Sequence, residues 1–269
     1  MDDLGITFVG HASVLIRING SWTLTDPVFS ERVSVIRRQS RPGLGLADLP
    51  RLAAILVSHA HYDHLDLPTL RRLDPEVPLI LPARAKAVAR SLGPRRRLTE
   101  LRHWQSMELG EARVTAVPAS HFSGRWLVDT PLRPANGYVL EGPGGTVYFA
   151  GDTASDNPFG EIGRRFRLDV SLLPIGAYRP RWIMRWSHLS PAEALDAFES
   201  LEARFLIPIH WGAFRLSLEP LGEPVRQLLT LAERRGLRDR VILLHPGQTW
   251  NSGREPGRAA LRGLAPGTG

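Results

Sequence analysis

The sequence predicts an α/β protein in which two β-sheets pack face to face and helices cover their outer sides. Short strand-like runs dominate the first half of the chain, and strands alternate with helical segments in the second half. This order is typical of layered folds in which each element buries one apolar face. The length of 269 residues suits one large domain, and a hydrophobic content of 43% is enough to form its core.

The strand predictions rest on short apolar and β-branched runs bounded by turn residues. Gly10, Asn19 and Gly20 separate the first three of these runs. The predicted strands cover residues 5–9, 13–18, 22–25, 53–57, 78–81, 112–117, 137–140, 146–150, 169–173, 205–209 and 241–244.

Four segments show the periodicity of helices: residues 67–73, 83–92, 190–203 and 222–235. In the third of them, Ser190, Pro191 and Glu193 fit an N-cap, a first-turn proline and a capping box. We expect one domain over residues 1–253. The remaining residues, 254–269, are rich in glycine, proline and arginine, and we expect them to form a loose tail.

The composition restricts both the metal chemistry and the partners. The chain has no cysteine, so any metal ion must be bound by histidine and carboxylate side chains. The net charge of +7 comes almost entirely from arginine, because Lys86 is the only lysine. Such a charge favours anionic partners, but a genome biased towards arginine codons is the simpler explanation.

Location and assembly are less constrained by the sequence. No segment approaches the roughly 20 apolar residues of a membrane-spanning helix. The acidic start of the chain differs from the basic start of a secretory signal, so we expect a cytoplasmic protein. We expect no nucleic-acid partner, because the arginines are scattered and basic and aromatic residues interleave in one segment only. The oligomeric state stays open, a homodimer included.

The strongest local signal is the run SHAHYDHLD, which follows the predicted strand 53–57 directly. It places His59, His61, Asp63 and His64 on a loop that leaves a strand end. Imidazole and carboxylate groups are zinc ligands, and neighbouring ligands can serve two ions. Chance produces this spacing on the order of once in a thousand such sequences. The run therefore predicts a metal-binding loop.

Three later residues complete the pattern. His121, Asp152 and His210 each lie shortly after a strand-like run. A single histidine at a strand end is more often structural than a ligand. Because all three recur in the same setting, we expect them to converge with the loop at one edge of the sheets.

The order HxHxDH, then His, then Asp in a GDT turn, then His is similar to that of the metallo-β-lactamase superfamily. The runs GHASVLIRI, LTDPVFSER, SHAHYDHLD, PASHFSGR, YFAGDT, LLPIGAYRPRW and IPIHWGAF resemble N-acyl-phosphatidylethanolamine phospholipase D-like hydrolases. They resemble the ascorbate-phosphate lactonase branch more loosely. The resemblance covers roughly residues 5–250 and implies an αββα sandwich, with two mixed sheets face to face and helices outside.

The resemblance also implies a ligand set. It puts His59, His61 and His121 on one Zn²⁺ ion, puts Asp63, His64 and His210 on a second, and makes Asp152 the bridge between them. Two such cations share a hydroxide that acts as the nucleophile. Mn²⁺ and Fe²⁺ suit similar ligands.

Further residues receive roles from the same resemblance. Asp26 matches an aspartate that orients a ligand histidine, although an Asp-Pro turn explains it equally well. His188 is expected to assist catalysis near the substrate phosphate, together with Asp63, and a surface histidine beside a helix N-cap is the alternative. His11 and His245 lie beside glycine and proline turns, where we expect structural roles.

The segment 178–188 mixes three arginines with two tryptophans, an isoleucine and a methionine. We expect Tyr62, Tyr178, Arg181 and Trp182 to contact the substrate, with this segment forming a rim that meets phosphate, acyl chains or the inner face of a membrane. The alternative is a loop that packs its aromatic side chains on the core.

Together with the ligand pattern, the resemblance implies a dinuclear zinc phosphodiesterase of the phospholipase D type, acting on N-acyl-phosphatidylethanolamine-like lipids or related diesters. The alternative is a lactonase or another ester or amide hydrolase, because the same centre can attack a carbonyl carbon. A nuclease is less favoured, since the arginines are scattered. Retention of all seven candidate ligands argues against a non-enzymatic role.

Overall fold

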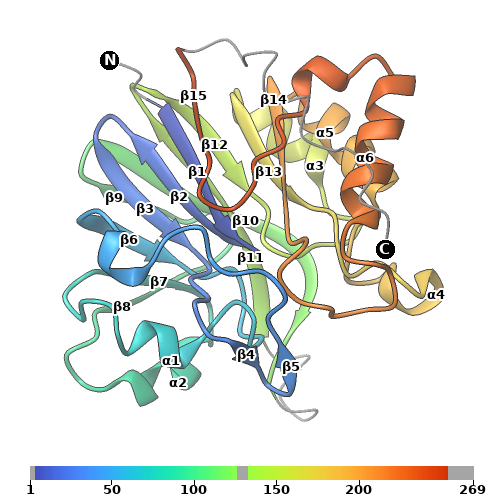
Figure 1. Ribbon diagram of the computed structural model, residues 1–269. Coiled ribbons are helices and arrows are strands. Elements are labelled where there is room, and N and C mark those ends of the chain that lie inside the picture. Colours follow the sequence, from blue (N-terminus) through green and yellow to red (C-terminus); the bar gives the residue numbers. More distant parts are fainter. Residues whose placement is uncertain (1–3, 126–132, 254–269) are drawn as a thin grey trace.

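Two mixed β-sheets pack face to face, and helices cover the outer side of each (Figure 1). The structure is a computed structural model that describes residues 4–125 and 133–253. This arrangement confirms the predicted αββα sandwich. No helix in the described residues is long and apolar enough to cross a membrane.

The first sheet has seven strands in the order β15-β1-β2-β3-β6-β7-β8. Its first hairpins pair antiparallel, whereas β3, β6, β7 and β8 run parallel to one another. The strands are β1 (Leu4–Gly10), β2 (Ser13–Ile18), β3 (Ser21–Thr25), β6 (Leu52–Leu56), β7 (Leu79–Pro82), β8 (Leu98–Leu101) and β15 (Thr249–Asn251).

The second sheet has six strands in the order β14-β13-β12-β11-β10-β9. Strands β9 to β12 pair antiparallel, and β12, β13 and β14 run parallel. The strands are β9 (Ser106–Leu109), β10 (Ala112–Ser123), β11 (Arg133–Gly142), β12 (Gly145–Phe149), β13 (Val170–Pro174) and β14 (Phe205–Ile209). A separate ribbon pairs β4 (Arg32–Val33) with β5 (Ile36–Arg37).

Alternation along the strands builds the core between the sheets. In β1, Leu4, Ile6 and Phe8 face the second sheet, while Val9 belongs to the cluster on the outer side. Side chains of a strand point alternately to its two faces, so this period of two supplies both layers. β13 is buried along its whole length, as expected of a parallel strand covered on both faces.

Helices on the second sheet are longer than those on the first. The helices α3 (Phe159–Arg165), α5 (Pro191–Leu201) and α6 (Glu223–Arg234) contribute to the cluster outside the second sheet, and α1 (Leu67–Leu70) and α2 (Lys86–Ala89) lie outside the first (Figure 1). The short α4 (Arg181–Met184) projects from the side of the molecule. Single turns of 3-10 helix within the described residues are η1 (Leu46–Asp48), η2 (Arg90–Leu92) and η4 (Arg238–Arg240).

The predicted N-cap of α5 is confirmed. The Ser190 backbone N–H donates to Oε2 of Glu193 at 2.8 Å, and the Glu193 N–H donates back to Oγ of Ser190 at 3.4 Å. This reciprocal pair satisfies two backbone groups that the first turn leaves without partners.

The predicted strand at 241–244 is wrong. Val241 forms a single bridge with Leu206 at the edge of β14, and the chain then turns at Pro246 before β15 joins the other sheet. The apolar side chains in this stretch are buried without a ladder, which is why their pattern resembles a strand. The expected loose tail at 254–269 lies outside the described residues.

Strand ends determine where polar side chains gather. His11 follows β1, Asp26 follows β3, the loop 57–66 follows β6, and His210 follows β14. These ends meet at one edge of the sandwich, where the sheets hold the backbone and the loops carry the chemistry.

Candidate metal centre

The loop after β6 is held in place by the opposite sheet. The backbone N–H of Asn136 donates to the carbonyl oxygen of Ser58 at 2.9 Å, and the Tyr138 hydroxyl donates to the carbonyl oxygen of Val57 at 2.8 Å. The N–H of Ala60 donates to Oγ of Ser123 at 3.0 Å. Strands of the second sheet therefore position the predicted metal-binding loop of the first.

His59, His61 and His121 bring three ring nitrogens together. Nδ1 of His61 lies 2.9 Å from Nε2 of His59 and 3.2 Å from Nε2 of His121. Ligands about 2.0 Å from a tetrahedral zinc ion stand about 3.3 Å apart, so the spacing fits one ion. Burial lowers the pKa of all three imidazoles, and the neighbouring histidines lower that of His59 further.

Asp63, His64 and His210 form a second group. Oδ2 of Asp63 lies 3.5 Å from Nε2 of His64 and 3.6 Å from Nε2 of His210. Although burial opposes it, the carboxylates of Asp152 and Asp63 raise the pKa of His64 well above its usual value and that of His210 to about 9. Burial acts to raise the pKa of Asp63, but the nearby imidazoles hold it well below its usual range.

Asp152 lies between the two groups. Its Oδ2 is 3.2 Å from Nε2 of both His64 and His210, and 4.0 Å from Nε2 of both His59 and His121. The preceding Gly151 has φ = +62°, and a Cβ there would stand 2.4 Å from Cβ of Ser58. Only glycine therefore lets the strand turn sharply enough to place this carboxylate between the histidines.

Several buried polar atoms of the centre have no hydrogen-bond partner. They are Nε2 of His64, Nε2 of His210, Oδ1 of Asp152 and Nδ1 of His188. Buried polar atoms normally have hydrogen-bond partners, so four unpaired atoms in one cluster need an explanation. Cations held by these nitrogens and carboxylates would satisfy them, and the donor set fits zinc without cysteine.

Hydrogen bonds on the far side of the rings settle which nitrogen faces the centre. Nδ1 of His64 lies 2.6 Å from Oδ2 of Asp26, and Nδ1 of His121 lies 2.8 Å from the carbonyl oxygen of Ser187. Each of these oxygens accepts, so each Nδ1 carries a hydrogen, and in the neutral ring the lone pair is on the Nε2 that faces the centre. Asp26 thus occupies the orienting place expected of it, and this geometry goes beyond a simple Asp-Pro turn.

Ser58 extends the same arrangement to a third ring. Its Oγ donates to Oδ2 of Asp26 at 2.6 Å, which leaves it to accept a hydrogen from Nδ1 of His59 at 2.9 Å. Sequence reasoning missed Ser58. Its position directly before His59 was the only available signal.

His11 also belongs to the centre, contrary to the structural role expected for it. Its Nε2 lies 3.0 Å from Oδ2 of Asp63, and its ring centre lies 4.1 Å from that of His210. Burial, reinforced by His210, lowers the pKa of His11 to about 3. The other histidine expected to be structural, His245, is exposed and touches the edge of Trp211.

His188 lies beside Asp152, with Nδ1 3.7 Å from the bridging oxygen. Burial lowers its pKa to about 4, so the imidazole is neutral at pH 7. The segment before it is anchored by Arg181, which donates to the carbonyl oxygen of His188 at 2.9 Å and to both carboxylate oxygens of Glu193 at 2.6 and 2.7 Å.

Two of the four predicted substrate contacts are exposed, and the other two are bonded to side chains of the protein itself. Tyr62 is 39% exposed beneath the guanidinium of Arg125, and Trp182 is 74% exposed on α4. Tyr178 is buried, and its hydroxyl donates to Oε1 of Glu223 at 2.6 Å. Arg181 is similarly engaged within the chain, so the roles of these two as substrate contacts stay predictions.

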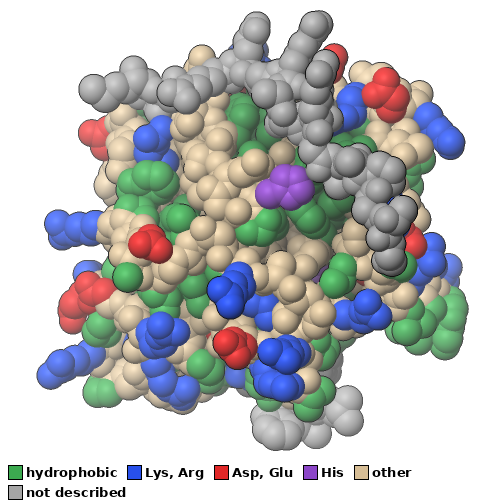
Figure 2. Space-filling model, in the orientation of Figure 1, with side chains coloured by type: hydrophobic (Ala, Val, Ile, Leu, Met, Phe, Trp, Pro, Cys, Tyr) green, Lys and Arg blue, Asp and Glu red, His purple; other side chains and the backbone are tan. Residues whose placement is uncertain are grey.

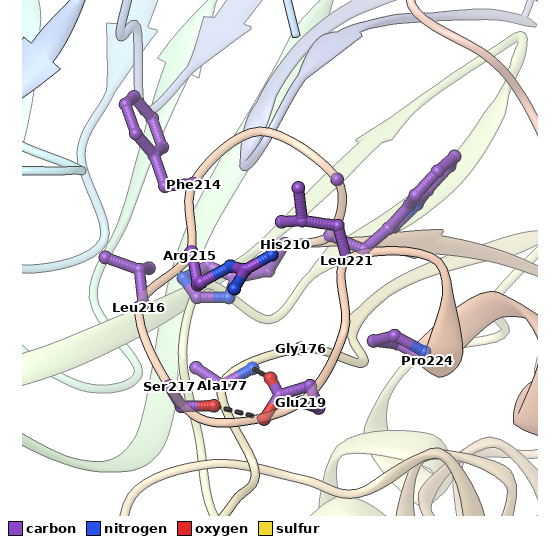
Figure 3. Close-up of a pocket in the computed structure, with 12 residues that line it drawn as sticks. Gly176, Ala177, His210, Phe214, Arg215, Leu216, Ser217, Glu219, Leu221 and Pro224 are labelled. Atoms are coloured by element: carbon purple, nitrogen blue, oxygen red, sulfur yellow. Dashed lines mark hydrogen bonds between the residues drawn. The ribbon is translucent and has the colours of Figure 1, made fainter. Parts of the chain in front are cut away.

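A small hollow lies beside His210 (Figure 3). It measures about 20 Å³ and lies between the turn at Gly176 and the loop 210–224, with Arg215 beside it. Glu219 closes its floor by accepting from the Ala177 N–H at 2.6 Å. A space of this size holds about one water molecule.

Comparisons with known proteins agree with this geometry. A β-lactamase superfamily domain matches residues 21–211. The chain belongs to the metallo-β-lactamase superfamily. An N-acyl-phosphatidylethanolamine-hydrolyzing phospholipase D of Caenorhabditis elegans is 34% identical over 267 residues, which cover 91% of this chain and 75% of the relative. A mitochondrial protein of Saccharomyces cerevisiae with the same activity in its name is 35% identical, over 90% of this chain and 55% of its own length.

An uncharacterised Mycobacterium tuberculosis protein is 40% identical over 242 residues, which cover 86% of this chain and 64% of that relative. The chain thus spans less than two thirds of this relative.

Solved structures show the same fold at low identity. A metallo hydrolase of Ignicoccus hospitalis has a TM-score of 0.70 at 21% identity, covering 92% of this chain and 97% of its own. A metallo-β-lactamase fold protein of Bacillus subtilis has a TM-score of 0.66 at 16% identity, covering 93% and 100%. This superfamily member resembles proteins named as metal-dependent hydrolases and proteins of the phospholipase D branch.

Proposed function

We propose that the protein is a dinuclear zinc phosphodiesterase of the phospholipase D type that acts on N-acyl-phosphatidylethanolamine-like lipids or related diesters. The observation that carries the proposal is the place of Asp152, whose Oδ2 stands between a group of three histidines and a mixed group of histidine and aspartate. The names of the relatives from Caenorhabditis elegans and Saccharomyces cerevisiae supply the substrate class.

The residues present fit two zinc ions. One ion would be held by His59, His61 and His121, and the other by Asp63, His64 and His210. The buried polar atoms that have no hydrogen-bond partner would then bind metal. Two zinc ions supply Lewis acidity towards the non-bridging phosphate oxygens and lower the pKa of a water molecule. Manganese and iron accept similar donors, so the identity of the ions as zinc is itself part of the proposal.

The side chains around the centre would orient the reactants. His188 offers an unpartnered, neutral Nδ1 beside Asp152 and would donate a hydrogen bond to a substrate or leaving-group oxygen. Hydrolysis breaks the P–O bond to the alcohol, and water supplies both the new P–O bond and the proton on the departing alcohol. The burial of His64 and His210 keeps bulk water away and strengthens each electrostatic contact.

The apolar surface around α4 supports a lipid substrate. Trp182, Ile183 and Trp186 are 74%, 49% and 65% exposed, and Arg185 stacks over Trp186 with its guanidinium carbon 4.5 Å from the ring centre. Apolar side chains gather at the right-hand margin in Figure 2, where Figure 1 places α4. Tryptophan beside arginine suits the interface of an anionic bilayer, so we include peripheral membrane contact in the proposal.

Along the chain, the exposed apolar surface around α4 ends two residues before His188. Trp186 is followed by Ser187, whose carbonyl oxygen orients His121, and then by His188. Phe122 is 51% exposed, and its ring centre lies 5.0 Å from that of His61. A lipid lying against α4 would therefore present its headgroup to the metal-binding groups.

The basic side chains visible in Figure 2 are spread among acidic and apolar ones and do not form one strip. This distribution supports a small-molecule or phospholipid substrate in preference to nucleic acid.

The test is a substrate screen on purified protein with measured zinc content. N-acyl-phosphatidylethanolamine in vesicles, a soluble aryl phosphodiester and a simple lactone are compared with and without a chelator. Zinc-dependent cleavage of the lipid faster than of the lactone supports the proposal. Lactone turnover far above diester turnover, or no zinc-dependent turnover of either diester, refutes it.

A further inference from the structure

His11 occupies a left-handed turn that opens directly onto the metal centre. It lies between β1 and β2 with φ = +59° and is 1% exposed. A residue other than glycine pays a conformational cost in this left-handed region. Such outliers persist where the surrounding structure holds them, and they cluster at functional sites.

Both ends of His11 contact residues of the second group. Its carbonyl oxygen accepts from the backbone N–H of His210 at 2.8 Å. Its Nε2 lies 3.0 Å from Oδ2 of Asp63, the same oxygen that lies 3.5 Å from Nε2 of His64. A carboxylate oxygen accepts but never donates, so the His11 Nε2–H is the donor.

Asp63 is the most exposed of the three residues in the second group. Its side chain is 14% exposed, whereas those of His64 and His210 are 0% and 1% exposed. His64 is already held by Asp26, and the ring of His11 is fixed by edge contact with Phe214 at 5.2 Å between ring centres. His11 is therefore a donor held in place against the most exposed ligand of this group.

We propose that His11 is a positioning residue of the second metal site, orienting the Asp63 carboxylate through Nε2 and fixing the His210 backbone through its carbonyl oxygen. This inference rests on the proposed dinuclear centre. Residues that orient ligands in this way commonly change metal affinity about 10- to 100-fold when they are replaced. The group of His59, His61 and His121 receives no hydrogen bond from His11 among the described contacts, so the effect should be confined to one of the two ions.

Two variants separate the hydrogen bond from the packing. His11→Phe keeps a ring of similar shape and the same backbone cost but removes the donor. His11→Gln retains a donor N–H at a similar distance from the backbone. His245→Phe is the matched control, because His245 is exposed and lies outside the centre.

Zinc titrations of metal-free protein by calorimetry, with metal content measured separately, provide the readout. We expect two ions in the wild type and in His245→Phe. In His11→Phe we expect one ion of wild-type affinity and a second weakened about 10- to 100-fold, with most of the loss restored in His11→Gln. Wild-type affinity at both sites of His11→Phe, or equal weakening at both, overturns the inference.

A spectrum of the wild type tests the same idea without any substitution. Long-range ¹H–¹⁵N correlation in zinc-loaded protein should show His11 neutral with its hydrogen on Nε2. A zinc-bound Nε2 would make His11 a ligand and would overturn the positioning role. A wild type that binds fewer than two ions refutes the dinuclear centre itself, and this outcome is visible before any variant is compared.

Discussion

The Oδ2 atom of Asp26 lies 2.6 Å from Nδ1 of His64, and both side chains are fully buried. The same carboxylate accepts from the Ser58 N–H at 2.7 Å and from the Ser58 hydroxyl at 2.6 Å. One carboxylate after β3 therefore orients two histidines of the loop after β6, one directly and His59 through the serine. Neighbouring parallel strands make this possible, because both segments leave the same edge of the sheet.

The first prediction concerns this carboxylate. Asp26→Asn keeps the shape but replaces an anionic acceptor with a neutral amide, so His64 should become a weaker ligand. We expect zinc affinity of the second site to fall about 10- to 100-fold. Calorimetric titration of the metal-free variant measures it. The exposed Asp239→Asn should behave as wild type, and an unchanged Asp26→Asn would remove the orienting role.

The second prediction concerns the bridge. Asp152→Asn should lower the rate of hydrolysis on the order of 10³-fold, because Oδ2 of Asp152 lies within 4.0 Å of histidines from both groups. The circular dichroism spectrum should stay that of the wild type, since the side chain serves the centre and not the core. His61→Ala should lower the rate comparably by removing a ligand of the other group. Near-full activity in either variant contradicts the proposed mechanism.

The third prediction concerns pH. In the metal-free chain, the carboxylates overcome burial and raise the pKa of His210 to about 9 and that of His64 above its usual value. Both imidazoles are therefore protonated at pH 7 and must lose a proton to bind a cation. Zinc affinity should rise with pH from about 6.5 to 9, and binding at pH 7 should release at least one proton.

Calorimetry in two buffers of different ionisation enthalpy counts the released protons. His59, His61 and His121 add none to this count, because burial lowers the pKa of each and they are neutral already. Zinc uptake at pH 7 with no proton release would show that the second group is neutral before the metal arrives.

The fourth prediction concerns the exposed tryptophans of α4. The double variant Trp182→Ala/Trp186→Ala should reduce binding to anionic vesicles about 10-fold or more, since burying one large apolar side chain contributes about 1.5–3 kcal/mol. Activity on vesicle-borne lipid should fall in parallel, while activity on a soluble aryl diester should not.

Vesicle co-sedimentation provides the measurement. Val35→Ala is the control, because Val35 is 84% exposed on the separate ribbon of β4 and β5. Equal binding of the double variant and the wild type would exclude α4 as a membrane contact.

The sequence alone was enough to predict the sandwich and most of its strands. Alternation along β1 and β2 and the buried run of β13 depend on local burial, which leaves a periodic trace in the sequence. The capping box at Ser190 and Glu193 is equally local and was found for the same reason. Short edge elements such as β8 and β15 were missed, because few of their side chains are buried in a pattern.

The loop from His59 to His64 was also evident from spacing alone, together with the later strand-end residues His121, Asp152 and His210. Only the tertiary structure revealed that His11 and Ser58 serve the same centre, and that Tyr178 and Arg181 are bonded within the chain. The reason is physical. Ligand spacing is a local property of one segment, whereas a hydrogen bond such as that between His11 and Asp63 joins strand ends that are 52 residues apart and meet only in the folded sheet.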